Sequence, residues 1–140
     1  MPKDEDYIIE ICNDLLGCVA RRRYCFDFLR GDPSVRTQRR RMLPVDAYYP
    51  DLKLVIEYRE IQHFEPTDYW DRKITATGMT RGRQRRIYDK RRRNELPKHG
   101  IKLIELDCKM FGLNSRKRLR RHLAADRAVI ESKLKALRDD

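Results

Sequence analysis

Two acidic residues interrupt apolar runs within segment 43–63. Asp46 lies inside the run 45–48 and Glu57 inside the run 54–58, and both runs have the composition of short strands joined by a turn. A carboxylate among apolar neighbours is costly unless a cation or hydrogen bonds compensate it. Two such carboxylates on one hairpin therefore suggest a site for a divalent metal ion.

Strand geometry predicts which side chains share a face with these acids. Alternate residues point to opposite faces, so Glu57, Arg59 and His63 would lie together if the second strand continues that far. Asp46 joins them if the hairpin register places it beside Glu57. Such a surface could bind a hard cation and polarise a phosphate. The alternative is that Asp46 and Glu57 pair with arginines or lysines and only stabilise the fold, since structural ion pairs imitate active sites.

The composition favours a nucleic-acid partner. The chain has 140 residues, of which 39% are charged, and a formal net charge of +11, so we expect one domain that associates with a polyanion. The basic residues gather in clusters at 21–23, 39–41, 81–86, 90–93 and 116–121. Because these clusters are spread along the chain, they predict a surface that follows a nucleic-acid backbone and not a detachable tail.

Membrane and disulfide-based classes are not indicated. No apolar run approaches membrane-spanning length and the N-terminus lacks a signal-peptide pattern, so we expect a soluble, intracellular protein of the cytoplasm or nucleoid, without a membrane partner. Cys12, Cys18, Cys25 and Cys108 form no CxxC pair. Neither a zinc ribbon nor a disulfide framework follows, and three of these cysteines stand among apolar residues, as buried thiols do.

The hydrophobic pattern predicts an α/β fold with a central mixed sheet flanked by helices. The expected elements are a helix at 4–17, strands at 19–29, 45–48, 54–58 and 101–106, a very basic helix at 84–96 and a basic C-terminal helix within 114–140. We expect a single domain over 1–140. Residues 30–42 have the composition of a loop or strand lead-in, and 64–83 that of a variable loop over a site.

Four further residues stand out for their types and positions. Glu5 lies at the edge of the apolar stripe of the first helix and could face inward, although the helix dipole also favours an acid there. Asp89 lies among Arg and Lys residues, and the alternative to a functional role is a surface salt bridge. Tyr69 and Trp70 could stack on bases, although a lone Trp more often packs against its own domain.

The order Asp46, Glu57 to His63, a loop, a basic helix with Asp89 and then Gly100-Ile-Lys-Leu-Ile resembles the PD-(D/E)XK nuclease superfamily. It looks most like the branch of very-short-patch repair and phage-type homing endonucleases (EDxHD, Vsr-like). The resemblance spans roughly residues 5–107 and is most specific over LVIEYREIQHFEP. It implies a restriction-endonuclease-like fold and a magnesium-dependent hydrolase that cuts or nicks DNA.

The resemblance also implies roles for individual residues. Asp46 and Glu57 would bind Mg²⁺, for which Mn²⁺ could substitute, and His63 would activate the attacking water or stabilise the phosphate. Asp89 would orient His63 or hold a metal-bound water, and Glu5 would do likewise from the opposite side. The residues expected to contact nucleic acid are Arg59, Gln62, Arg83, Arg85, Arg86, Lys90 and Arg91.

The chain departs from the family pattern at Arg59-Glu60, where the family usually has Asp-Gly. Arg59 falls where the wider superfamily places lysine, and arginine does not lose its proton, so it cannot act as a base. This departure keeps open a non-catalytic nucleic-acid-binding protein on a decayed nuclease fold. A basic structural protein that prefers folded RNA is a third alternative. Because no separate DNA-reading motif is visible, specificity would come from a partner protein or domain.

Overall fold

The computed structural model describes residues 3–60 and 72–138. Its elements are α1 (Asp4–Leu16), β1 (Arg21–Arg30), β2 (Met42–Tyr49), η1 (Pro50–Leu52), β3 (Leu54–Arg59), α3 (Arg81–Lys98), β4 (Lys102–Asp107), η3 (Cys108–Met110) and α4 (Leu123–Arg138). The four strands form one sheet in the order β1-β2-β3-β4. Neighbours are antiparallel from β1 to β3, and β3 and β4 are parallel. The expected mixed sheet of an α/β fold is therefore confirmed.

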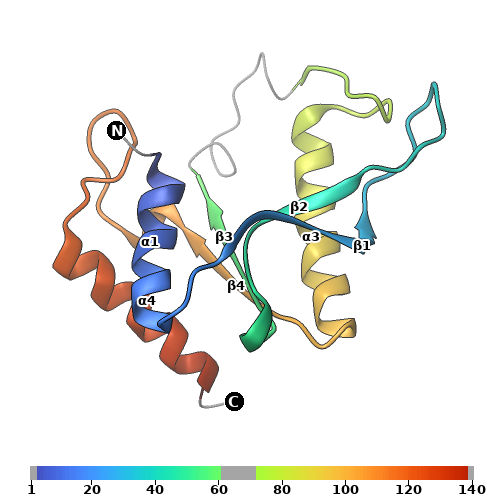
Figure 1. The fold of residues 1–140 in the computed structure, drawn as a ribbon. Coiled ribbons are helices and arrows are strands. Elements are labelled where there is room, and N and C mark those ends of the chain that lie inside the picture. The colour runs from blue at the N-terminus through green and yellow to red at the C-terminus, as the bar shows by residue number, and fades with distance from the viewer. Residues whose placement is uncertain (1–2, 61–71, 139–140) are drawn as a thin grey trace.

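The helices lie on both faces of this sheet. Helices α1 and α4 pack together on one face, and α3 covers the other (Figure 1). Strand β3 is buried along its whole length, and its side chains serve both layers: Leu54, Ile56 and Tyr58 join the core beside α1 and α4, whereas Val55 joins the core beside α3. The predicted alternation of faces is confirmed for this strand. In the described ranges, no helix is both long and apolar enough to cross a membrane.

Strand β2 exchanges its faces at Asp46. Val45 belongs to the core beside α3, but Ala47, two residues later, belongs to the core beside α1 and α4. In a regular strand these two side chains would share a face. On β1 the register places Arg23 opposite Asp46, and Arg23 has φ 50°, in the left-handed region. In both strands the side chains therefore change faces at the same place, which the strict alternation of a regular strand does not predict.

The basic helix is longer than its sequence pattern indicates. It begins at Arg81 and not at residue 84, because Thr80 caps it and its hydroxyl oxygen accepts a hydrogen bond from the N–H of Arg83. It ends at Lys98, with Pro97 inside the last turn. The last strand is likewise displaced by one residue, to Lys102–Asp107.

The C-terminal helix begins at Leu123, so the expected helix over 114–122 is corrected to a loop. Side-chain acceptors hold this non-helical backbone. Oδ1 of Asn114 accepts from two N–H groups within the loop, and Oδ2 of Asp4 accepts from the N–H of Leu119 at 3.0 Å. Such competition from Asn and Asp side chains is a known obstacle to helix formation.

The four cysteines are free thiols. Cys12 and Cys108 are buried in the core beside α1 and α4, whereas Cys18 and Cys25 are half-buried. Burial raises the pKa of Cys12 to about 12, so this thiol stays protonated at neutral pH. These positions agree with a packing role for the two buried thiols.

Candidate active site

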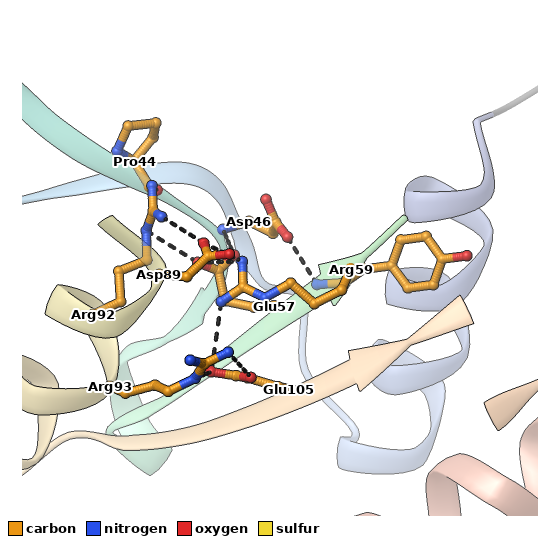
Figure 2. A network of polar contacts seen from close by, with 9 residues as sticks. Pro44, Asp46, Glu57, Arg59, Asp89, Arg92, Arg93 and Glu105 are labelled. Atoms are coloured by element: carbon orange, nitrogen blue, oxygen red, sulfur yellow. Dashed lines mark hydrogen bonds and ion pairs between the residues drawn. The ribbon is translucent and has the colours of Figure 1, made fainter. Parts of the chain in front are cut away.

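The carboxylates of Asp46 and Glu57 lie where β2 and β3 separate. The last regular pair of this ladder is Ala47 with Ile56. Beyond it, the N–H of Asp46 donates to Oε2 of Glu57 at 2.9 Å, and the N–H of Tyr58 donates to Oδ2 of Asp46 at 2.8 Å (Figure 2). Carboxylate oxygens here accept the bonds that backbone carbonyls would accept in a continued ladder. The register thus brings the two acids together, which is the condition on which Asp46 was expected to join Glu57.

A third carboxylate reaches this point from α1. Glu5 faces the sheet with its side chain 17% exposed, and Arg22 of β1 holds it through Nη2 at 2.5 Å. The same guanidinium donates from Nε to the carbonyl oxygen of Asp46 at 3.0 Å. The pKa of Glu5 is raised, first by burial and then by the negative charge and hydrogen bonding of Asp46. Glu5 therefore lies against Asp46, and the inward interpretation of this residue agrees with the structure.

The pKa of Asp46 is strongly raised. Burial, followed by the charge of Glu57, raises its pKa to about 7, although the hydrogen bonds with Tyr58 and Glu5 act in the opposite direction. Crowded carboxylates in a low-dielectric place resist simultaneous ionisation, and a bound cation would relieve their repulsion. Within residues 3–60 and 72–138, no three His, Cys, Asp or Glu side chains already surround one metal position. A cation here would take oxygens from Asp46 and Glu57 and complete its shell with water, as Mg²⁺ commonly does.

A buried arginine, Arg59, and a partly buried one, Arg92, connect Glu57 with Asp89. Nε of Arg92 lies 3.2 Å from Oε1 of Glu57, while Asp89 Oδ1 lies 2.9 Å from Nη1 of Arg59 and 3.2 Å from Nη1 of Arg92 (Figure 2). Glu57 is 2% exposed and Asp89 7%. The ion-pair interpretation thus applies to both acids, but as a buried network: Asp89 is not a surface salt bridge.

Glu105 on β4 is a member of this network that the sequence reasoning missed. It is the register partner of Glu57 in the parallel pair, and Arg93 binds it through Nε at 2.5 Å and Nη2 at 3.0 Å. This hydrogen bonding raises the pKa of Arg93. Nη2 of Arg59 lies 3.5 Å from the same carboxylate. The alternation of β4, which puts Glu105 on the face of Leu103, was the available signal. Nothing in the arginine clusters distinguishes Arg22 and Arg92, which were also missed.

A cavity of about 450 Å³ opens between α3 and the carboxyl ends of β3 and β4. Four basic and three acidic side chains line it, together with Met110. Arg59 is among them, and its Nε and Nη2 have no hydrogen-bond partner in the described part of the chain. The cavity adjoins the carboxylate site through Arg59, whose Nη1 is 4.0 Å from Oε1 of Glu57.

The residues expected to contact nucleic acid occupy different situations on α3. Arg83, Arg86 and Lys90 are exposed, and Arg85 is half-buried. Arg91 has a structural task, because it donates to the carbonyl of Arg30 at 3.1 Å and pairs with Asp32 at 2.7 Å, which ties the β1–β2 loop to α3. The remaining candidates, Gln62, His63, Tyr69 and Trp70, lie outside the described residues.

Comparison with known proteins adds no relative to this geometry. No family model, curated protein or solved structure matches the chain. A function for the site is therefore argued from its own contacts and charges.

Proposed function

We propose that the chain is a metal-dependent endonuclease that hydrolyses DNA phosphodiester bonds, on a restriction-endonuclease-like fold of the PD-(D/E)XK kind. The observation that carries the proposal is the meeting of Glu5, Asp46 and Glu57 from three elements at the point where β2 and β3 part. Carboxylates crowded at one buried point repel one another, and a bound cation would relieve that repulsion. The net charge of +11 supplies the attraction for a polyanionic substrate.

Mg²⁺ suits the donor set, since Asp46 and Glu57 offer carboxylate oxygens, and Mn²⁺ would substitute. When bound, the metal would lower the pKa of a water molecule and neutralise charge on the phosphate. Oε1 of Glu57 already lies 3.2 Å from Nε of Arg92, so Glu57 would divide its two oxygens between this arginine and the metal site. Oδ2 of Asp46 keeps its hydrogen bond with the N–H of Tyr58, which fixes the carboxylate on the sheet.

The other residues of the site would handle the proton and the substrate charge. His63 would take the proton of the attacking water, because Arg59 stays protonated and cannot. Asp89, buried at the centre of α3, would orient His63 or a metal-bound water. Arg83, Arg86 and Lys90 would hold the nucleic-acid backbone from the exposed side of α3.

A non-catalytic nucleic-acid-binding protein is the second candidate, and one observation favours it. Arg92 and Arg59 already supply positive charge to Glu57 and Asp89 in the buried network. These two acids are therefore compensated in the fold without a metal ion. Such a protein would bind DNA through the same arginine-rich surface and would leave it intact.

Cleavage of supercoiled plasmid in Mg²⁺ or Mn²⁺ tests the proposal with three proteins: the parent, Asp46→Asn and Asp51→Asn. Asp51 is an exposed residue of η1, so its variant is the matched control. We expect the parent and the control to cut alike. The cleavage rate of Asp46→Asn should be lower by about a hundredfold or more, because a lost metal contact costs several kcal/mol in the transition state. Its affinity for DNA should stay near that of the parent.

Two outcomes would contradict the endonuclease. A parent that binds plasmid but leaves it supercoiled with either metal would instead support the second candidate. Equal cleavage by the parent and Asp46→Asn would place the active site elsewhere. A parallel assay with folded RNA separates both candidates from a basic structural protein, which would prefer the RNA and be insensitive to the metal.

A further inference from the structure

We infer that the cavity between α3 and β4 binds a backbone phosphate of the nucleic acid next to, and distinct from, the one that is cleaved. This inference rests on the proposed function only in assuming that a neighbouring phosphate is cleaved. The phosphate site itself is argued from the residues that line the cavity. Asp46, Glu57 and Glu5 do not line this cavity. A phosphate bound there would therefore not be at the carboxylate site.

Arg59 provides the buried donor of this phosphate site. Its side chain is only 7% exposed, and Nη1 is engaged by Asp89 at 2.9 Å. Nε and Nη2 point to no hydrogen-bond acceptor among the described residues, although Nη2 lies 3.5 Å from Glu105. A buried guanidinium with unsatisfied N–H groups is costly, and phosphate oxygens match its fork of donors.

The acids of the cavity do not cancel its attraction for an anion. Asp89 is paired with Arg59 and with Arg92, and Glu105 is held by both ends of the Arg93 guanidinium. Oδ1 of the third acid, Asp107, accepts the N–H of Lys109 at 2.8 Å. The cavity lining therefore holds four cations against three acids.

Arg86 and Lys90 complete the site at the surface. They lie four residues apart on α3, so they are neighbours on one side of the helix, and both are exposed. Neither makes an ion pair with another described residue. Two such cations beside a buried arginine donor fit one phosphate group, and Arg59 connects that phosphate to the carboxylate site through its 4.0 Å approach to Glu57. The cavity would thus set the position of the strand along the site.

The test is a binding titration without metal, in EDTA and at constant ionic strength, so that it is independent of cleavage. The probe is thymidylyl-3′,5′-thymidine, which carries one phosphodiester and no terminal phosphate; thymidine 5′-monophosphate and inorganic phosphate are the parallel arms. The readout is the NMR signal of the Arg59 Nε–H group and the dissociation constant. The variant is Arg86→Ala with Lys90→Ala, and the control is Lys133→Ala with Lys135→Ala, which removes the same charge from exposed positions of α4.

We expect the dinucleotide to shift the Arg59 signal in the parent and the control. The Arg86→Ala, Lys90→Ala variant should bind about tenfold or more weakly, since one hydrogen bond between charged groups contributes at least roughly that factor. Equal affinity of this variant and the parent, or an Arg59 signal that does not respond, would overturn the inference. Binding of the 5′-monophosphate without the dinucleotide would overturn it too, in favour of a site for terminal phosphates. A parent that binds the dinucleotide but cuts no plasmid would reject only the endonuclease.

Discussion

The N–H of Tyr58 donates to Oδ2 of Asp46 at 2.8 Å, so a side chain of β2 takes over a hydrogen bond that a regular ladder would give to the backbone. The bond fixes Asp46 firmly but also buries its charge beside Glu57, whose Oε2 accepts the N–H of Asp46. A site that is both well fixed and unfavourable for stability is where function is expected.

The stability of the protein should carry the signature of the raised Asp46 pKa of about 7. Between its usual value near 4 and this value, Asp46 is protonated in the folded state and ionised in the unfolded state. The folded state then binds more protons, so this residue's contribution to the free energy of unfolding falls as pH rises through that window. At pH 8 the cost would be up to about 4 kcal/mol if this pKa acted alone. The raised pKa of Glu5 acts in the same direction.

Asp46→Asn isolates this effect, because asparagine resembles the protonated acid in shape. Urea unfolding of the parent and the variant should give similar stabilities near pH 4. The variant should become progressively more stable than the parent up to pH 8. A stability difference that does not change with pH would show that Asp46 titrates normally.

Magnesium should stabilise the parent above pH 7 and not Asp46→Asn. A ligand that binds only the folded state at ten times its dissociation constant adds about 1.4 kcal/mol, which raises the melting temperature by a few degrees. The measurement is thermal unfolding at pH 8 with MgCl₂ against NaCl of equal ionic strength. If the metal binds at Asp46, the rise is absent in the variant; the same rise in both proteins would assign the metal to another place.

The fold was largely predictable because its signals are local. The apolar stripe of α1 points to one helix with one buried face, and the apolar run of β3 points to one short strand, which is buried on both faces. The face exchange at Asp46 could not be read in this way, since it occurs opposite Arg23 of the neighbouring strand, which adopts a left-handed conformation. The loop before α4 was not predicted from the sequence for a similar reason. Its backbone is held by Asp4, which is 115 residues away in the sequence.

The candidate site was predictable in Asp46 and Glu57, but not in Glu105 or in its arginines. An acid inside an apolar run is rare, so Asp46 and Glu57 stand out in the sequence. In a chain with 33 Lys and Arg residues, no pattern shows that Arg92 turns inward to Glu57 while Arg93, the next residue, is half exposed on Glu105. That distinction arises only when α3 is placed over the sheet, where a rotation of one residue decides which guanidinium is buried.

Replacing Arg59 should lower the free energy of unfolding more than replacing an exposed arginine of the same network. Its side chain is 7% exposed and serves Asp89 and Glu105 together, so Arg59→Met leaves buried carboxylates with one cation fewer. Breaking a buried pair from one side typically costs about 3 kcal/mol or more. Arg93→Met is the matched control: its side chain is 51% exposed, and exposed pairs contribute about 1 kcal/mol or less. Urea unfolding at pH 7 compares the two, and a smaller loss for Arg59→Met than for Arg93→Met would contradict the role given to the buried network.

The β1–β2 loop should supply part of the salt dependence of DNA binding. Arg36, Arg39 and Arg41 are exposed on this loop, which projects from the body of the molecule, and the N–H of Val35 anchors it to the carbonyl of Ala76 at 2.8 Å (Figure 1). Log affinity falls as log salt rises, and an arginine that neutralises one phosphate makes this slope steeper by roughly one unit. If each of the three contacts a phosphate, replacing all of them by alanine should make the slope shallower by about three units. Fluorescence anisotropy with one DNA duplex at several salt concentrations measures it, with Lys133→Ala, Lys135→Ala as the control. An unchanged slope would mean that the loop does not touch the DNA backbone and that other basic residues of the chain make the contacts.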